Sequence, residues 1–231
     1  MTEIQIDKNE VLRYLGYRSS NVDKNTSDMI DHCITELRTI ARYRYTYSIF
    51  DIEVGFYKDM SCINVKDTNL RFTGNDIYEH LRDSRKCAVM AVTLGVEVDN
   101  AIRLAQNTDM LKAVVLDSCA SEYIEKVCDY VKSEILIEAR KLGCGINFAF
   151  APGYGDFPLD IQKKLVDAVD AGRKIGLTVT ENYLMIPRKS VTGVVGFVRD
   201  LEYSRHKSKC ETCSMRKTCV FRKDGKTCGR N

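Results

Sequence analysis

The chain has 231 residues, of which 44% are hydrophobic, enough to bury one substantial core. No stretch approaches the roughly 18 uninterrupted apolar residues of a membrane helix, and the opening MTEIQIDKNE lacks the basic start and apolar run of a secretory signal. The net charge of +3 hides an asymmetry, because nine Lys or Arg and two acids follow from Arg205 onward, which leaves the tail at +7 and the body at −4. We therefore expect a cytoplasmic protein with a basic tail, and we do not expect nucleic-acid binding, since Phe221 is the only aromatic residue among these bases.

The first half of the chain predicts helices and strands in turn. Apolar residues recur at helical spacing in two N-terminal segments, and Ile, Val, Tyr and Phe partly alternate in the next two. A short helix with Asn75 as its cap then precedes a continuous apolar run that ends at Gly95. The expected elements are helices 8–15 and 23–42, strands 45–57 and 63–72, helix 77–82 and strand 87–94.

The second half contains the strongest helical signal, over residues 109–142, which Gly143 ends. The order of helices and strands shows no repeated strand–helix–strand unit, so we predict an α+β fold. Five residues mark the expected buried face of the long helix: Ala120, Ile124, Val127, Val131 and Ile135. The other expected elements are helix 98–105, strand 145–151, a helix opened by Pro158, and β-rich stretches 177–186 and 190–198.

Several catalytic signatures are missing from the sequence. It contains no glycine-rich phosphate loop and no nucleophile elbow. Its histidines, His32, His80 and His206, are too far apart to form a local metal pair or dyad, and we interpret them as helix-surface or tail residues. We therefore predict no catalytic residue, and the chain does not resemble a self-contained hydrolase, kinase or dehydrogenase.

The most distinctive segment is residues 151–158, with the sequence APGYGDFP. Its glycines and prolines fix the backbone and let a ligand approach the main chain closely, while Tyr154 adds a flat face and a hydroxyl. The alternative interpretation is a tight connection from a strand to a helix. The residues alone leave both interpretations open.

A second distinctive segment is residues 177–193, with the sequence LTVTENYLMIPRKSVTG. Glu181 lies in an otherwise apolar β stretch, where a carboxylate is costly unless it is paired or exposed in a cleft. The alternative is an edge-strand glutamate that faces water.

The order of these motifs is specific. A Pro-Gly-Tyr turn followed by a helix, a Thr-Glu strand, an apolar run, Pro and Ser-Val-x-Gly resembles the activation domain of cobalamin-dependent methionine synthase. Stand-alone bacterial versions are also similar in their openings, as in EVLRYLGY from Glu10, in AVTLG from Ala91 and in IPRKS from Ile186. The resemblance covers about residues 5–200, and the two C-terminal motifs are its specific part.

The resemblance implies a C-shaped α+β fold with a bent antiparallel sheet flanked by helices, which binds S-adenosylmethionine and docks over cobalamin held by a partner. It implies a reactivation subunit in methionine biosynthesis, acting on a cobalamin-dependent methionine synthase that lacks its own activation domain. A flavodoxin-like donor supplies an electron to inactive cob(II)alamin, and S-adenosylmethionine supplies the methyl group. The chain is then an accessory of a methyltransferase system and not a complete enzyme.

The resemblance also implies site residues. Gly153 and Tyr154 match the Gly-Tyr of the family's Arg-x-x-x-Gly-Tyr motif, with main-chain groups near Ala151 expected beside the ligand. Glu181 matches the acidic residue of the Thr-Glu strand, a partner for the ligand's amino or sulfonium charge or for the corrin edge. The family's arginine falls on Ala149, so the natural bidentate partner of the methionine carboxylate is missing. Arg188 and Lys189 are the candidate substitutes.

The basic tail carries a compact set of four thiols, which the synthase domain lacks. Two, five and eight residues separate them in order, and the first pair has the spacing of a thiolate metal knuckle. Zinc and an iron–sulfur cluster both suit four thiolates, and the alternatives are an unmetallated tail or a redox pair. We predict a domain over residues 1–204 and a metal-binding tail over residues 205–231 with ligands Cys210, Cys213, Cys219 and Cys228.

The other six cysteines are scattered singly in apolar or helical context, as expected of core residues in a reducing compartment: Cys33, Cys62, Cys87, Cys119, Cys128 and Cys144. Two further functions remain open. One is an iron–sulfur or zinc redox accessory that keeps the fold but has altered ligand binding, which Ala149 and the tail both suit. The other is an interaction module whose basic tail docks a partner.

Overall fold

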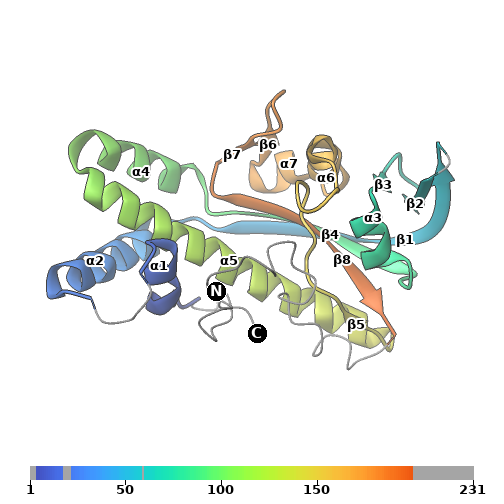
Figure 1. Cartoon of the computed structure of the whole chain (residues 1–231), viewed down its shortest axis with the longest axis horizontal. Coiled ribbons are helices and arrows are strands. Elements are labelled where there is room, and N and C mark those ends of the chain that lie inside the picture. Colours follow the sequence, from blue (N-terminus) through green and yellow to red (C-terminus); the bar gives the residue numbers. More distant parts are fainter. Residues whose placement is uncertain (1–3, 18–21, 59, 200–231) are drawn as a thin grey trace. The chain divides into compact units, whose positions relative to one another are not determined.

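The computed structural model describes residues 4–17, 22–58 and 60–199 of the chain (Figure 1). The four tail cysteines, Cys210, Cys213, Cys219 and Cys228, lie outside the described residues. The metal site and the domain boundary at residue 204 therefore stay predictions. In the described part of the chain, no helix is long and apolar enough to cross a membrane.

The two N-terminal helices are confirmed, and side chains cap both of them. The carboxylate of Asp7 accepts a main-chain N–H in the first turn of α1 (Lys8–Tyr14), and Asp23 does the same for α2 (Lys24–Ile40). Such caps supply acceptors for amides that have no partner inside the helix. The local sequence therefore determines where both helices begin.

The long central helix is also confirmed. It is α5 (Met110–Lys141), and α4 (Val96–Thr108) precedes it in place of the shorter predicted helix. Helical spacing of apolar residues places them along one face, which packs inward. All five residues predicted for that face are buried: Ala120, Ile124, Val127, Val131 and Ile135.

The strands form a six-stranded sheet in the order β3-β2-β1-β4-β8-β5 and a two-stranded sheet of β6 and β7 (Figure 1). Strand β1 pairs antiparallel with β2, β2 with β3, β5 with β8, and β6 with β7. Helices and antiparallel strands in this order confirm the α+β class. The strands are β1 (Arg44–Tyr57), β2 (Met60–Val65), β3 (Arg71–Thr73), β4 (Lys86–Thr93), β5 (Gly145–Ile146), β6 (Thr178–Val179), β7 (Met185–Ile186) and β8 (Ser190–Val198).

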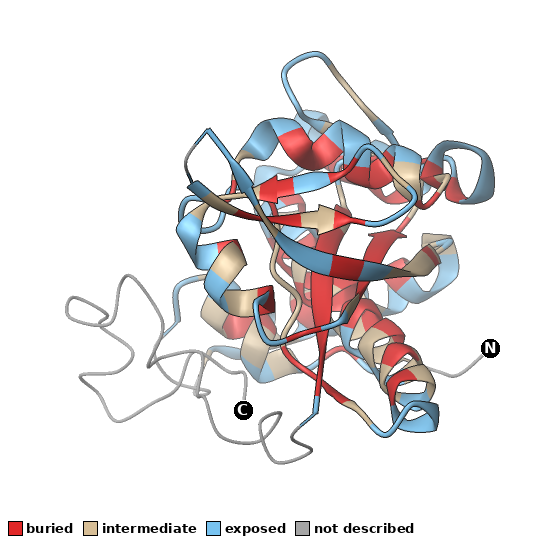
Figure 2. Ribbon diagram, turned by 90° about the vertical axis from the view of Figure 1, so that its right-hand side faces the viewer, coloured by how far each residue is buried: buried red, intermediate tan, exposed pale blue. Residues whose placement is uncertain are grey.

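Strands β4 and β8 are the most deeply buried (Figure 2). All of β4 after its first residue is buried, and so is all of β8 except its second residue. A strand buried in this way has a near-continuous apolar sequence in place of an alternating one. The unbroken apolar runs CAVMAV and GVVGFV reflect this burial.

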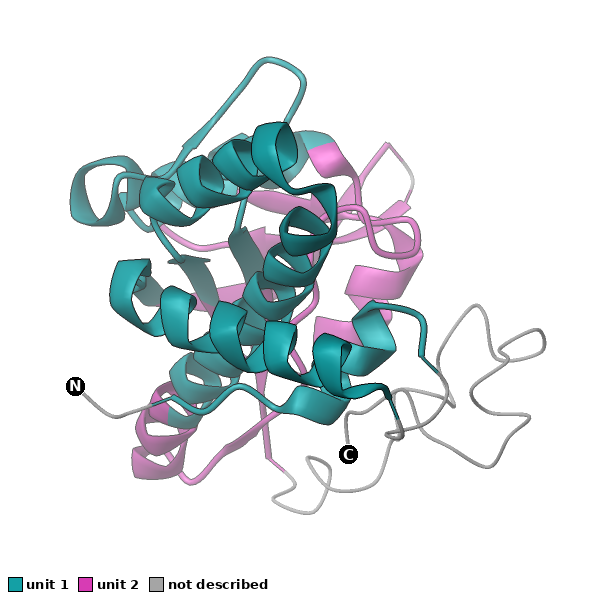
Figure 3. Ribbon diagram, turned by 90° about the vertical axis from the view of Figure 1, so that its left-hand side faces the viewer, with its two compact units in different colours: residues 1–48, 89–133, 160–193 teal, residues 49–88, 134–159, 194–231 magenta. Residues whose placement is uncertain are grey.

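The chain divides into two compact units, shown in different colours in Figure 3. It passes from one unit to the other inside β1, β4, α5, the short helix η1 (Leu159–Ile161) and β8, so neither unit is a continuous piece of sequence. Of the described residues, unit 1 comprises those within 4–48, 89–133 and 160–193, and unit 2 those within 49–88, 134–159 and 194–199.

Two predicted strands are interrupted. Segment 63–72 forms β2 and β3, because the chain turns between them at Asp67, which has a φ of 58°. Segment 145–151 keeps β5 and a single bridge between Phe150 and Val194. The break occurs because the side-chain oxygen of Asn147, and not a main-chain oxygen, accepts the hydrogen bond from the amide of Gly196 at 2.6 Å.

Two further segments differ from the prediction. The β-rich stretch 177–186 is a hairpin of β6 and β7 and not one strand. The helix expected after Pro158 is divided into η1 (Leu159–Ile161), α6 (Gln162–Ala168) and α7 (Ala171–Ile175). Asp170 separates the last two because it adopts a left-handed conformation with a φ of 54°.

The predicted cap of the short third helix is wrong. Asn75 is the first residue of α3 (Asn75–Leu81), Gly74 precedes it, and no side chain of the helix's own start caps it. The carboxylate of Asp156 takes that role from 81 residues away. A local sequence pattern cannot show a cap that comes from another part of the chain.

Candidate functional site

Residues 151–158 form a compact turn whose main-chain groups bond largely to one another. The amide of Tyr154 donates to the carbonyl of Ala151 at 3.2 Å, and that of Phe157 donates to Tyr154 at 3.0 Å. The amide of Gly153 donates back to the carbonyl of Phe157 at 2.9 Å. Gly153 has a φ of 85°, which a residue with a side chain rarely adopts, so glycine is required there by conformation.

Tyr154 projects from this turn. Its side chain is 68% exposed, and its ring meets Phe150 edge-on, with the ring centroids 6.4 Å apart. Phe157 anchors the turn in the core, because it is buried and its ring packs edge-on against that of Phe72, with the ring centroids 5.7 Å apart. The turn therefore presents an aromatic face to solvent on a buried aromatic base, an arrangement suited to a flat or cationic ligand.

Ala149 is half-buried, and its chain neighbours Phe148 and Phe150 belong to an aromatic cluster. The ring of His80 lies 4.5 Å from the ring of Phe148 and 5.1 Å from that of Phe150, centroid to centroid. Position 149 itself supplies no charge. Ala149 and its neighbours Phe148 and Phe150 therefore supply no cationic fork for a carboxylate.

His80 is packed among rings and is not the surface residue predicted from the sequence. Burial lowers the pKa of His80 to about 4, although hydrogen bonding to the main chain of Phe148 works in the opposite direction. The imidazole is therefore neutral at pH 7 and does not replace the missing arginine. Its position three residues after the buried Ile77 and beside Leu81 is the helical spacing that could have revealed this burial.

Glu181 lies in the turn of the β6–β7 hairpin and not within a strand. The amide of Thr180 donates to the carbonyl of Leu184 at 2.9 Å, and the Thr180 hydroxyl accepts from the Leu184 amide at 3.1 Å, which closes the turn. Glu181 is exposed, so its carboxylate is hydrated. It belongs to unit 1, whereas the Gly153–Tyr154 turn belongs to unit 2.

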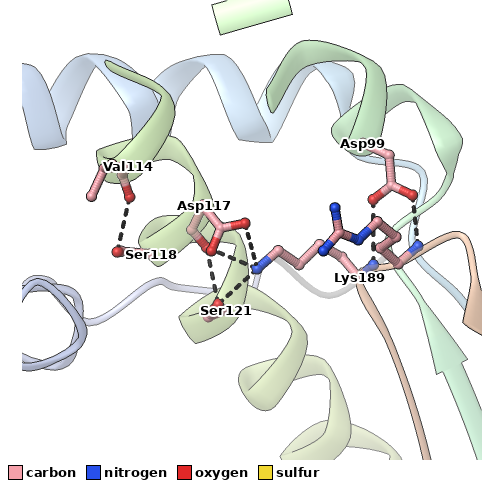
Figure 4. Close-up of polar contacts among 7 residues, drawn as sticks. Asp99, Val114, Asp117, Ser118, Ser121 and Lys189 are labelled. Atoms are coloured by element: carbon pink, nitrogen blue, oxygen red, sulfur yellow. Dashed lines mark hydrogen bonds and ion pairs between the residues drawn. The ribbon is translucent and has the colours of Figure 1, made fainter. Parts of the chain in front are cut away.

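Lys189 is held by an ion pair within unit 1 (Figure 4). Its ammonium lies 2.9 Å from a carboxylate oxygen of Asp117 and donates to the Asp117 carbonyl at 3.2 Å and to the Ser121 hydroxyl at 2.9 Å. Asp99 in turn accepts the main-chain amides of Arg188 at 2.6 Å and Lys189 at 3.3 Å. With all three ammonium protons engaged, Lys189 is not the replacement partner for a ligand carboxylate.

The six cysteines of the body are five buried residues and one half-buried residue, Cys144, which departs from the predicted core set. Burial raises the pKa of the Cys33 thiol to about 11 and those of Cys87 and Cys119 to about 12. These thiols are not nucleophiles at neutral pH. Over residues 4–17, 22–58 and 60–199, no three His, Cys, Asp or Glu side chains are grouped to hold a metal ion.

Comparison with known proteins gives one family and one fold. The family model described as "Vitamin B12 dependent methionine synthase, activation domain" matches residues 77–207, more than half of the chain. No curated protein matches. A solved structure titled "Crystal Structure of the MetH Reactivation Domain bound to AdoHcy" matches with a TM-score of 0.62 and 13% identity, over 96% of this chain and 82% of that one. The chain therefore belongs to the family of activation domains of vitamin B12-dependent methionine synthase.

Proposed function

We propose that this chain reactivates a cobalamin-dependent methionine synthase in trans, by binding S-adenosylmethionine and presenting its methyl group to reduced cobalamin on the partner. Membership of the activation-domain family supports this role, and the observation that carries it is the exposed Gly153–Tyr154 turn at the family's Gly-Tyr position. The cofactors supply the methyl transfer and an external flavodoxin-like donor supplies the electron. The protein supplies position, which reduces the entropic part of the barrier.

The residues of the turn suit one end of the ligand. The exposed ring of Tyr154 offers a face to a sulfonium cation or an adenine ring. We assign main-chain contacts to Ala151 and Gly153, and the attraction of the ligand's amino group to Glu181. For the carboxylate end, Ala149 and the neutral His80 offer no cation.

Introducing an arginine at position 149 tests this assignment. We expect Ala149→Arg to tighten the binding of S-adenosylmethionine by about tenfold to a hundredfold, because a charged hydrogen-bonding partner in a partly desolvated site contributes about 1.5–3 kcal/mol. Isothermal titration into anaerobically purified protein measures the gain. Ala149→Leu is the control, since it adds bulk without charge.

The same titration with the native protein tests the proposed function. Micromolar binding establishes a site for S-adenosylmethionine despite Ala149. Binding only by the arginine variant would mean that this chain keeps the fold but has another ligand. The reactivation role fails if the protein neither binds the synthase nor speeds its recovery from the cob(II)alamin state.

Removing the exposed ring gives a separate prediction. Tyr154→Ala should weaken the binding of S-adenosylmethionine by about tenfold, because the loss of a stacked or cation-facing ring costs about 1–2 kcal/mol. The free energy of unfolding should change by less than about 0.5 kcal/mol, since the side chain is mainly exposed. Titration and urea denaturation measure the two effects, with Tyr17→Ala as the control because Tyr17 is 40% exposed and lies outside the proposed site.

A further inference from the structure

The Gly153–Tyr154 turn and helix α3 hold each other through two aspartates. The carboxylate of Asp156 accepts the amide of Asn75 at 2.6 Å and the amide of Asp76 at 2.9 Å. The carboxylate of Asp76 accepts the amide of Asp156 in return, at 3.2 Å. Each aspartate therefore binds main-chain amides of the other's segment, as a capping box does within one helix. We call Asp76 and Asp156 the aspartate pair.

Two glycines allow this close approach. A Cβ on Gly74 would lie 2.8 Å from the Asp156 carbonyl oxygen and from its carboxylate, and a Cβ on Gly155 would overlap the carboxylate of Asp76. Both glycines also have positive φ values, 122° and 53°. The second glycine of the Gly-Tyr-Gly-Asp motif is thus explained by the aspartate pair and not by a ligand.

The C-terminal end of α3 is held by residues 147–150, which lie just before the Gly153–Tyr154 turn in the sequence. The side-chain nitrogen of Asn147 donates to the carbonyl of His80 at 2.8 Å, and the His80 ring packs on Phe148 and Phe150. A helix of seven residues is not stable by itself in water, so these tertiary contacts stabilise it. The dependence is mutual, because the turn gains its fixed position from α3.

We propose that the aspartate pair is a positioning element, which sets the conformation of the Gly153–Tyr154 turn and thereby the affinity of the site for S-adenosylmethionine. This inference rests on the proposed function. The path is short: Asp156 lies two residues after Tyr154, and the intervening Gly155 is packed against Asp76. Neither aspartate touches the ligand in this proposal, and both act through the backbone of the turn.

Hydrogen exchange of the full chain tests the positioning step without a ligand. We expect Asp156→Ala to speed exchange about tenfold in two peptides, one covering the start of α3 and one covering residues 151–157, with β2 unchanged. Asp156→Asn keeps one carbonyl acceptor and should give an intermediate effect. Asp160→Ala, which removes an exposed carboxylate from η1, should leave both peptides unchanged.

Titration with S-adenosylmethionine then tests the consequence. Asp156→Ala should lose about tenfold in affinity, and Asp160→Ala should bind as the native chain does. If the Asp156→Ala variant does not fold, Asp76→Ala removes only the return bond from the Asp156 amide and should still speed exchange in the turn. Unchanged exchange in the turn overturns the inference, whereas altered exchange in a chain that binds no S-adenosylmethionine overturns the proposed function alone.

Discussion

Replacing His80 with phenylalanine should reduce the fall in the free energy of unfolding between pH 7 and pH 4. The folded-state pKa of His80 is about 4 because of burial, against an ordinary value of 6.5. Between these values the unfolded chain binds a proton that the folded chain does not, so the free energy of unfolding falls as the pH drops through this window. The loss amounts to about 3 kcal/mol at pH 4 relative to pH 7.

The packing supports this expectation. Within the part of the chain that the structure describes, the Nε2 atom of His80 is buried and has no hydrogen-bond partner, and the ring lies among the rings of Phe148 and Phe150. A cation formed there has no counter-charge in the cluster, and phenylalanine has nearly the same shape without the titration. Urea denaturation at several values between pH 7.5 and pH 4 measures the slope for native chain and variant.

His32 provides the matched control. Its side chain is 69% exposed on α2, so His32→Gln should leave the slope of the native chain in place. A His80→Phe variant that loses stability with acid as steeply as the native protein would show that carboxylates elsewhere cause the loss.

Truncating Phe157 to alanine should lower the free energy of unfolding by about 3–5 kcal/mol. The side chain is 1% exposed, and it joins Phe72 and Phe150 through edge-on or tilted ring contacts at 5.7 and 6.1 Å. The substitution removes the buried ring surface and leaves a cavity, and both costs add. Urea denaturation at neutral pH measures the change.

Phe56 is a control of the same residue type, because its side chain is 77% exposed on β1. Phe56→Ala should change the free energy of unfolding by less than about 0.5 kcal/mol. Equal costs for the two variants would contradict the view that Phe157 anchors the turn. Since Phe157 lies directly after Asp156, the Phe157→Ala variant should also speed hydrogen exchange of residues 151–157.

The site combines a retained turn with a lost charge. The resemblance places Gly153 and Tyr154 on the family's Gly-Tyr and Ala149 on its arginine, so the proposed site would keep the turn and lack the arginine. Another residue that binds the carboxylate of the ligand would have to be a cation. Lys189 is one candidate, but it is already bound to Asp117 and Ser121. The Ala149→Arg variant is therefore the most direct test of whether the chain that lacks the arginine also binds a different ligand.

The sequence alone determined the elements whose causes are local. The caps at Asp7 and Asp23, the helical spacing of α5 and the apolar runs of β4 and β8 are each decided by near neighbours or by simple periodicity. The Pro-Gly-Tyr and Thr-Glu motifs were also visible at this level, and with them the family. These features need no knowledge of distant partners.

Only the tertiary structure decided the features made by contacts between distant segments. Asp156, and not the predicted Asn75, caps α3. The side chain of Asn147 interrupts the strand beside β8, and Asp117 forms an ion pair with Lys189. His80 is half-buried and neutral because rings from another part of the chain pack against it. In each case a hydrogen bond or a loss of solvation depends on a group dozens of residues away, which local propensity cannot encode.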